Sequence, residues 1–230
     1  MRENSRIPTS AQMGIHEHLA ALLERHQKAP YLKPYADYNV AAFSDSWDRW
    51  QRWAPNAPLI LDSCCGTGES SIALAKCFPD HYIIGVDQSI VRLRRNLSAK
   101  RESSTLPPNV DFVRADLVDY WRLVHDAGLS LSHHFLLYPN PWPKIGHLSR
   151  RWHGHPVFPA MLELGGILEC RSNWHIYVDE FCFAVNYLKK HRAVCEVYKP
   201  EHAMTAFERK YLESGHALYR ATVILQNKDS

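Results

Sequence analysis

The chain has 230 residues, of which 46% are hydrophobic and 22% charged, and its formal net charge is +3. This length predicts one large domain, and the sequence has no apolar run of about 18 residues, which excludes a membrane span. The six cysteines form no C-x-x-C pair and the fourteen histidines scatter along the chain, so we expect buried thiols, with no disulfide scaffold and no metal site.

Residues 1–55 predict a helical extension ahead of the main domain. Apolar residues between 15 and 23 have the spacing of a short amphipathic helix, and residues 25–38 mix lysine, proline and tyrosine in a predicted loop. Three tryptophans then recur at every third position, Trp47, Trp50 and Trp53. On a helix this spacing places the rings on one stripe, which favours packing against the main domain over stacking on RNA.

Residues 56–230 alternate between predicted strands and helices. We expect strands at 58–63, 81–87, 109–115, 131–138, 165–171, 193–199 and 219–227, and helices at 69–78, 88–101, 117–127, 156–163 and 175–191. Repeated strand–helix units predict an α/β, doubly wound, Rossmann-like fold with a mostly parallel seven-stranded sheet and helices on both faces. The last two strands have no helix-length pattern between them, so we expect an antiparallel edge there.

The first predicted strand ends in a glycine-rich turn. Gly66 and Gly68 let the backbone turn tightly and approach a ligand where a Cβ atom would collide. Asp87 closes the second predicted strand 19 residues after Gly68, where its carboxylate can accept hydrogen bonds from both hydroxyls of a ribose. Together these features predict a nucleoside-binding site.

Three further residues indicate which cofactor this turn holds. Ser71 stands where a dinucleotide-binding turn has its last glycine, which disfavours NAD. Asp62 precedes the turn, and its carboxylate would repel a pyrophosphate but suits a ligand with an ammonium or a sulfonium group. S-adenosylmethionine carries both groups. Asp116 ends the third predicted strand, where it would either face the adenine edge or cap the next helix.

A proline-rich loop follows the fourth predicted strand. Three prolines between residues 138 and 144 fix φ and remove backbone donors, so this segment can be neither an interior helix nor a central strand. Its amide and indole, Asn140 and Trp142, with the cations that follow, are suited to holding a flat polar ring beside a polyanion. Ligands of open α/β sheets lie at strand ends, so the loop predicts a nucleotide-like substrate, although such loops also serve only to pin a strand end.

These motifs resemble those of one enzyme family, the bacterial-type tRNA (guanine-N7)-methyltransferases. The segment Tyr138-Pro139-Asn140-Pro141-Trp142-Pro143-Lys144, followed by His147, Arg150 and Arg151, is similar to the family's F-P-D-P-W-P-K…H…R-R stretch. Residues 165–177 resemble its G-G-…-T-D-x-x-x-Y stretch, and residues 205–209 resemble its T-x-F-E-x-R segment. The turn at 62–68 resembles motif I of class I methyltransferases, with Cys64 in place of the first glycine. The resemblance leaves residues 1–55 unmatched.

The resemblance implies a class I methyltransferase that uses S-adenosylmethionine and acts on tRNA or another structured RNA. It implies a cofactor site made of Asp62, Cys64, Gly66, Gly68, Asp87, Gln88, Asp116 and Leu117. It implies substrate contacts from Trp142, Lys144, Arg150, Arg151, Asn173, Thr205, Phe207 and Glu208, with Thr205 and Glu208 in the guanine pocket. Asn140 is then the catalytic residue, because it orients the base.

Two positions depart from the family pattern. Asn140 and Asn173 stand where the family has aspartates, so a neutral amide that also donates replaces an acceptor-only ion at each position. This change leaves open methylation of an exocyclic amino group, a substrate other than tRNA, or a homologue that binds cofactor or RNA without catalysis. An NAD-dependent oxidoreductase is a poorer alternative, because of Asp62 and Ser71.

Partners and location follow from charge and from the start of the chain. Because the net charge is small, RNA binding must come from a local basic patch, and Lys144, Arg150 and Arg151 are expected to contact phosphates. Other basic groups most simply coat solvated helix faces. The polar first residues do not resemble a signal peptide, so we expect a cytoplasmic monomer or homodimer that binds no membrane.

Overall fold

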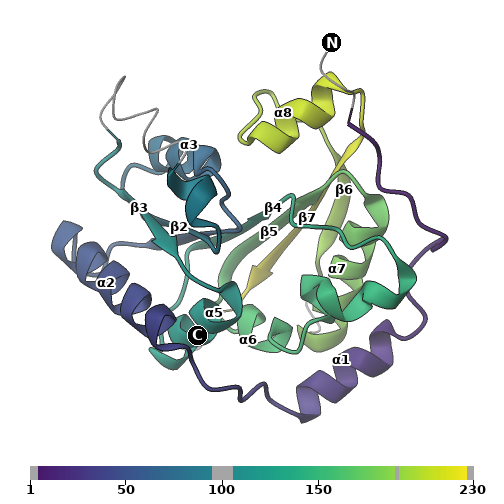
Figure 1. Cartoon of the computed structure of the whole chain (residues 1–230), viewed down its shortest axis with the longest axis horizontal. Helices are drawn as coiled ribbons and strands as arrows, with labels where there is room; N and C mark the ends of the chain where they lie inside the picture. Colours follow the sequence, from purple (N-terminus) through teal and green to yellow (C-terminus); the bar gives the residue numbers. More distant parts are fainter. Residues whose placement is uncertain (1–4, 95–105, 190–191, 227–230) are drawn as a thin grey trace.

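A computed structural model describes residues 5–94, 106–189 and 192–226, and seven strands in it form one sheet in the order β3-β2-β1-β4-β5-β7-β6 (Figure 1). The strands are β1 (Leu59–Ser63), β2 (Tyr82–Asp87), β3 (Val110–Arg114), β4 (His133–Leu137), β5 (Gly166–Ser172), β6 (Val194–Tyr198) and β7 (Leu218–Leu225). Neighbours among β1 to β5 are parallel, and β7 is antiparallel to both β5 and β6. The predicted doubly wound fold with an antiparallel edge is confirmed.

The central strands β1 and β2 are mostly apolar because helices cover both of their faces, and each ends in polar residues. All residues of both strands are buried, which is typical of parallel strands in this kind of fold. Their register pairs Ser63 with Val86, so both strands end at the same level. The turn after β1 and the carboxylate of Asp87 therefore lie side by side at one edge of the sheet.

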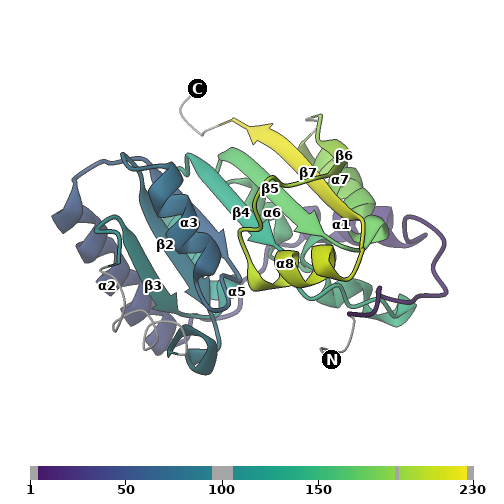
Figure 2. The same ribbon diagram turned by 90° about the horizontal axis from the view of Figure 1, so that it is seen from above.

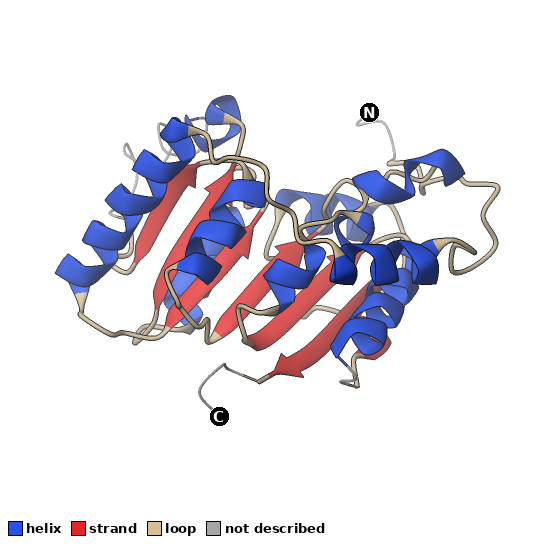
Figure 3. Ribbon diagram, turned by 90° about the horizontal axis from the view of Figure 1, so that it is seen from below, coloured by secondary structure: helices blue, strands red, loops and turns tan. Residues whose placement is uncertain are grey.

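Helices flank the sheet on both sides. They are α1 (Leu19–Lys28), α2 (Asp37–Trp53), α3 (Glu69–Cys77), α5 (Leu117–Asp126), α6 (Phe158–Leu162), α7 (His175–Lys189) and α8 (Ala206–Glu213), with 3-10 helices η1 (Ile145–Arg150) and η2 (Trp152–Gly154). Figures 2 and 3 show α3 and α8 on one face of the sheet and α5, α6 and α7 on the other. The helix predicted at 88–101 is observed at residues 90–94, and residues 95–101 lie outside the described residues.

The N-terminal residues pack on the main domain in two places. Leu19 and Leu23 of α1 are fully buried, and α1 lies along α7 (Figure 1). Trp50 of α2 is buried in the same core, and Trp47 and Trp53 pack against it, which confirms the packing predicted for the tryptophan stripe. The predicted loop is shorter than expected, because α1 continues to Lys28 and α2 begins at Asp37.

One helix was not predicted. Helix α8 lies between β6 and β7, where the sequence showed no helix-length pattern. It has eight residues, too few for a clear apolar period, and its N-terminus is fixed by the Thr205 side chain, which accepts a hydrogen bond from the Glu208 N–H. The T-x-x-E sequence at this point is therefore a helix-capping signal as well as a family motif.

The expectation that all cysteines are free thiols was wrong for two of them. Cys182 of α7 and Cys195 of β6 form a disulfide, with Cα atoms 6.6 Å apart. Their separation of 13 residues in the sequence matches no disulfide pattern. The pairing arises because α7 packs against β6, a contact between elements that only the fold creates.

Candidate active site

The turn after β1 has an unusual backbone. Cys64, Gly66 and Gly68 all have positive φ, at 61°, 60° and 79°. A Cβ atom at Gly68 would lie 2.2 Å from the ring of Phe112, so this position requires glycine. Cys64, which stands where the motif has its first glycine, adopts a left-handed conformation at a cost of about 1–2 kcal/mol.

Asp62 presents an unpaired acceptor to this turn. Its side chain is fully buried, and Oδ2 accepts hydrogen bonds from the hydroxyls of Ser70 and Ser71, each at 2.6 Å. Oδ1 has no partner among the described residues. Burial raises the pKa of Asp62 to about 6, against the lowering effect of the two serines. A buried, unpaired carboxylate oxygen fits the cationic amino-acid end of S-adenosylmethionine.

Ser71 explains why this turn works without its third glycine. In the motif, the third glycine lets the helix pack closely on the sheet. Here Ser71 has that position, and the helix still packs closely because the residue facing it on β2 is Gly85, which has no side chain. A Cβ atom at Gly85 would lie 2.4 Å from Ser71 Oγ. The serine thus holds Asp62 in place, and the glycine on the neighbouring strand provides the space.

Asp87 is held rigidly at the end of β2. Its carboxylate accepts from the N–H groups of Gly66 at 3.0 Å and Ser89 at 2.8 Å, and from Arg92 at 3.4 Å. The side chain is buried, whereas Gln88 next to it is exposed. Gly66 and Arg92 both donate to Oδ2 and Ser89 donates to Oδ1, so Oδ1 keeps one acceptor site for a ribose hydroxyl.

Asp116 caps helix α5, as the alternative interpretation proposed. Its Oδ1 accepts from the Val118 N–H at 2.9 Å, and Leu117 beside it is buried. Asp116 also lines a cavity of about 320 Å³ between residues 31–39 and the start of α5. Its backbone N–H donates to Asn39, so the N-terminal extension contacts this end of the cofactor site.

The proline loop (residues 138–144) is strained and exposes its polar groups. Tyr138 and Trp142 have φ values of 53° and 45°, which are uncommon for bulky residues and tend to cluster at functional sites. Asn140 is exposed, and its Oδ1 accepts from the Trp142 N–H at 3.3 Å. The Arg150 guanidinium lies 4.9 Å from the centre of the Trp142 ring. Arg150 and Lys144 are both exposed.

Arg151, in contrast, does not face solvent. It is fully buried, and it donates to Glu180 at 2.6 Å and to the carbonyl groups of Trp142 and Lys144. His153 contacts the same Glu180 oxygen at 2.8 Å. This ion cluster (Arg151, His153 and Glu180) holds the base of the proline loop, so the described structure does not support the phosphate contact that we expected from Arg151.

Glu208 is also engaged within the protein. It is fully buried, and it accepts from the Tyr138 hydroxyl at 2.7 Å, from Arg171 at 3.0 Å and from the Met204 N–H at 2.6 Å. With Thr205 at the cap, this pairing ties α8 to the end of β4. Glu208 therefore does not lie open to a base, whereas Thr205 is partly exposed and Phe207 is half exposed.

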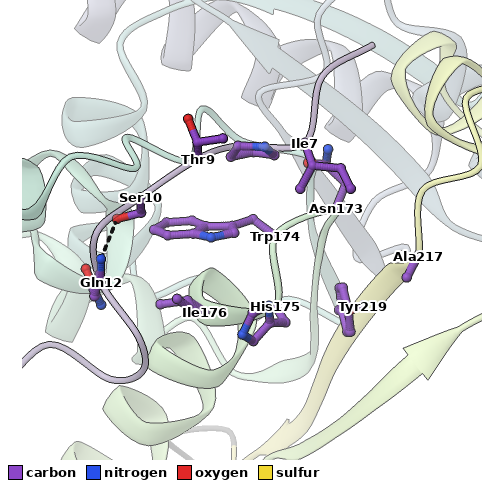
Figure 4. Close-up of a pocket in the computed structure, with 11 residues that line it drawn as sticks. Ile7, Thr9, Ser10, Gln12, Asn173, Trp174, His175, Ile176, Ala217 and Tyr219 are labelled. Atoms are coloured by element: carbon purple, nitrogen blue, oxygen red, sulfur yellow. Dashed lines mark hydrogen bonds between the residues drawn. The ribbon is translucent and has the colours of Figure 1, made fainter. Parts of the chain in front are cut away.

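Asn173 lies at the carboxyl end of β5 beneath the N-terminal arm (residues 5–14). Its Nδ2 is 3.1 Å from His216 Nδ1, and His216 Nε2 is 2.9 Å from the Ser5 carbonyl oxygen. A carbonyl can only accept, so Nε2 carries the proton and Nδ1 accepts from the Asn173 amide. The side-chain carbonyl of Asn173 is the group left for another donor. Figure 4 shows Asn173 beside Ile7 of the arm.

The structure thus brings the residues predicted to bind the cofactor, Asp62, Gly66, Gly68, Asp87 and Asp116, to one edge of the sheet, next to the proline loop. Sequence reasoning missed Ser70, Ser71, Tyr138, Arg171, Glu180 and His216 as contributors. Only the serines had a local signal, because they follow the glycine turn directly.

The described residues contain no group of His, Cys, Asp or Glu placed to hold a metal ion. In the same residues, we find no helix of the length and apolarity needed to cross a membrane.

Comparison with known proteins places this site in a family. Residues 56–221 match the model of a family described as "Putative methyltransferase". A tRNA (guanine-N(7)-)-methyltransferase of Acidithiobacillus ferrooxidans is 28% identical over 83% of this chain and 86% of its own length. The corresponding protein of Leifsonia xyli is 27% identical, over 71% and 74%.

Solved structures share the fold. The 16S rRNA methyltransferase KamB superposes with a TM-score of 0.56 at 15% identity, covering 85% of this chain and 97% of that protein. The antibiotic-resistance methyltransferase Kmr gives a TM-score of 0.52 at 19% identity, covering 80% and 93%. The family model spans well over half of the sequence, and the site fits the cofactor. The chain therefore belongs to this methyltransferase family and is an S-adenosylmethionine-dependent enzyme.

Proposed function

We propose that the enzyme methylates a base of a structured RNA in the cytoplasm, with guanine N7 of tRNA as the first candidate. The observation that carries this proposal is the unpaired oxygen of buried Asp62 at a left-handed turn, next to a strained loop that presents Asn140, Trp142 and Arg150. Relatives over most of the chain are named tRNA (guanine-N(7)-)-methyltransferase, which supports this substrate.

The residues have distinct tasks in this reaction. S-adenosylmethionine supplies the methyl group on a sulfonium when it is bound. Asp62 holds its ammonium group, Asp87 its ribose and Asp116 its adenine edge. Guanine N7 has a free lone pair, so the protein needs to align the base and exclude water more than to remove a proton. Asn140 orients the base with the two hydrogens of Nδ2 and with the lone pair of Oδ1 that the Trp142 N–H does not use.

Methylation of a different base nitrogen is the second candidate. Asn140 and Asn173 are neutral, and the carboxylate of Glu208 is taken by Tyr138 and Arg171. A guanine amino edge would therefore lose the charge-assisted hydrogen bonds that carboxylates provide, which are about twice as strong as neutral ones. The side-chain amide of asparagine pairs well with the edge of adenine. The asparagine at the proline loop therefore also supports this second candidate.

Product analysis tests the proposal directly. The protein is incubated with methyl-labelled S-adenosylmethionine and bulk unmodified tRNA, and the RNA is digested to nucleosides for mass spectrometry. Labelled 7-methylguanosine would support the first candidate, and a different methylated nucleoside would favour the second. Cofactor binding without label on the tRNA would contradict tRNA methylation and point to another substrate or to a binding role.

Arg150 is expected to contribute to the salt dependence of RNA binding. Arg150→Ala removes one exposed phosphate contact, so the slope of log Kd for tRNA against log salt should fall by about 0.7–0.9. Fluorescence anisotropy of labelled tRNA at several salt concentrations measures this slope. Arg25→Ala, at an exposed position of α1, is the matched control and should leave the slope unchanged. An unaltered slope in Arg150→Ala would remove the phosphate assignment.

A further inference from the structure

The register of the sheet places Asn173 level with the proline loop. Strands β4 and β5 are parallel, and Leu137 at the end of β4 pairs with Arg171 of β5. One residue further along, the Tyr138 N–H donates to the Arg171 carbonyl at 2.9 Å. The proline loop follows β4 and Asn173 follows β5, so both begin at the same edge of the sheet. Asn173 is therefore a neighbour of the loop to which the proposed function assigns the methylated base.

Asn173 also lines a cavity of about 410 Å³, a volume typical of small-molecule sites. The N-terminal arm forms one wall of this cavity, and Ser10 of the arm donates to the Pro143 carbonyl of the proline loop at 2.5 Å. Figure 4 shows Asn173 beside Ile7 of the arm, with the Trp174 ring at the centre. The wall of the cavity is joined to the loop in this way, so the cavity and the loop form one site.

The His216 ring, which contacts Asn173, is held in one orientation. It is buried, and it stacks on Tyr211 with ring centres 5.4 Å apart and 14° between the planes. Its Nε2 lies 2.9 Å from the Ser5 carbonyl oxygen, and its Nδ1 lies 3.1 Å from Asn173 Nδ2. Both ring nitrogens are engaged, so the ring cannot turn over without losing both contacts.

These contacts decide where the carbonyl oxygen of Asn173 lies. Because the Ser5 carbonyl only accepts, Nε2 carries the proton of the neutral His216 ring and Nδ1 is an acceptor. The Asn173 amide therefore turns its Nδ2 group towards His216. Rotating the amide by half a turn would place its Oδ1 against the lone pair of Nδ1, which is repulsive. No donor contacts Oδ1 among the described residues, so this oxygen keeps both lone pairs for a ligand.

We propose that His216 is a positioning residue for the methylated base, because it turns the Asn173 carbonyl oxygen towards the cavity, where the oxygen accepts from an N–H group of that base. The proposal rests on the proposed function, since it states which edge of the base the same site recognises. Guanine fits this acceptor through its N1–H and amino groups. A base edge with only acceptors would leave the oxygen unpaired. Held in this way, the Asn173 amide presents one acceptor at a fixed place, as a carboxylate would, without carrying a charge.

Two substitutions of His216 separate this role from simple docking of the arm. An asparagine side chain reaches to the position of Nδ1, so His216→Asn can still accept from Asn173 but cannot reach Ser5. A glutamine side chain reaches to the position of Nε2, so His216→Gln can still donate to Ser5 but offers no acceptor to Asn173. We therefore expect His216→Asn to keep the orientation of Asn173 and His216→Gln to lose it. If His216 served only to dock the arm, the order of the two variants would be reversed.

Methylation of bulk unmodified tRNA with methyl-labelled S-adenosylmethionine measures this order. We expect kcat/KM to fall about 5- to 150-fold in His216→Gln, the range for a buried polar group left without its partner. His216→Asn is the rescue variant and should remain at least about fivefold more active than His216→Gln. His202→Gln, at an exposed position after β6, is the matched control and should behave as wild type. Calorimetry with S-adenosylhomocysteine monitors folding and should give wild-type affinity for all three variants.

The results distinguish this role of His216 from the proposed function. If the wild type methylates tRNA and His216→Gln is as active as wild type, or more active than His216→Asn, the role of His216 is overturned and the proposed function stands. A wild type that binds cofactor but methylates no tRNA would overturn both.

A second measurement needs no RNA. Two-bond proton–nitrogen correlation spectra of protein labelled with ¹⁵N-histidine identify which nitrogen of His216 is protonated, and the spectrum of His216→Asn assigns its signals. At pH 7.5 we expect a neutral ring with the proton on Nε2. A proton on Nδ1, or on both nitrogens, would overturn the role of His216, because Nδ1 could then not accept from Asn173.

Discussion

Asp62→Asn is expected to weaken binding of S-adenosylhomocysteine about 10- to 150-fold, measured by isothermal titration calorimetry at pH 7.5. The substitution keeps the shape of the side chain but removes the negative charge next to the ligand's ammonium group. A hydrogen bond to a charged partner contributes about 1.5–3 kcal/mol, which corresponds to this range. Asp80→Asn, at an exposed position after α3, is the control and should bind as wild type does.

The pH dependence of binding identifies the group responsible. Burial raises the pKa of Asp62 to about 6, so the wild type loses the favourable charge as the pH falls below that value. Its affinity should then decline by up to tenfold for each pH unit between about 6 and 5. The Asp62→Asn variant has no carboxyl to titrate and should show a flat profile. An unchanged slope in the variant would assign the titration to another group.

The same substitution should stabilise the fold. The pKa of Asp62 rises from 3.8 to about 6 on folding, so ionisation at neutral pH opposes the folded state. At about 1.4 kcal/mol for each pH unit, the free energy of unfolding at pH 7.5 should increase by up to about 3 kcal/mol. Urea denaturation measures it. Lower affinity combined with higher stability would indicate that the site keeps a buried charge for binding at the expense of stability.

Glu180→Gln is expected to lower the free energy of unfolding by about 3–5 kcal/mol, because it leaves the fully buried Arg151 without its counter-charge. Urea denaturation at pH 7.5 measures the loss. Cofactor-dependent methylation should also fall, since Arg151 holds the carbonyl groups of Trp142 and Lys144 in the proline loop.

The control for this variant is Glu163→Gln. Glu163 pairs with Lys189 near the surface, and such pairs contribute about 0–1 kcal/mol. Burial alone would raise the pKa of Glu180, but His153 and Arg151 lower it from 4.5 to about 2. The contribution of Glu180 is therefore complete above pH 4.5 and is lost as the pH falls towards 2. A difference between wild type and variant below 1 kcal/mol at pH 7.5 would contradict the assigned role of the cluster.

The fold was largely predictable because its signals are local. Mostly apolar segments at 59–63 and 82–87, each followed by a helical pattern, are sufficient to predict parallel strands. Helix α8 was missed because eight residues are too few to show a period. The disulfide was missed because its two cysteines meet only when α7 packs on β6.

Positions of the candidate site were predictable from the sequence where the backbone or the motif accepts only one type of residue. Gly68 and Asp87 lie where their motif requires. Arg151 and Glu208 could not be placed, because the sequence does not show whether a charged side chain points outward or into the protein. Arg151 is buried because Glu180 and the carbonyl groups of the proline loop surround it. Glu208 is buried because Tyr138 brings a hydroxyl where the family pattern has phenylalanine.

The attachment of the arm has a consequence for synthesis of the chain. Ser5 bonds to Ser214 and His216, which lie 209 and 211 positions later in the sequence. On the ribosome, residues 5–14 cannot dock until residues 214–216 have emerged, and β7 must insert between β5 and β6 after that point. A nascent or truncated chain that ends before residue 214 therefore exposes an incomplete sheet and an undocked arm together, which makes such fragments prone to misassembly.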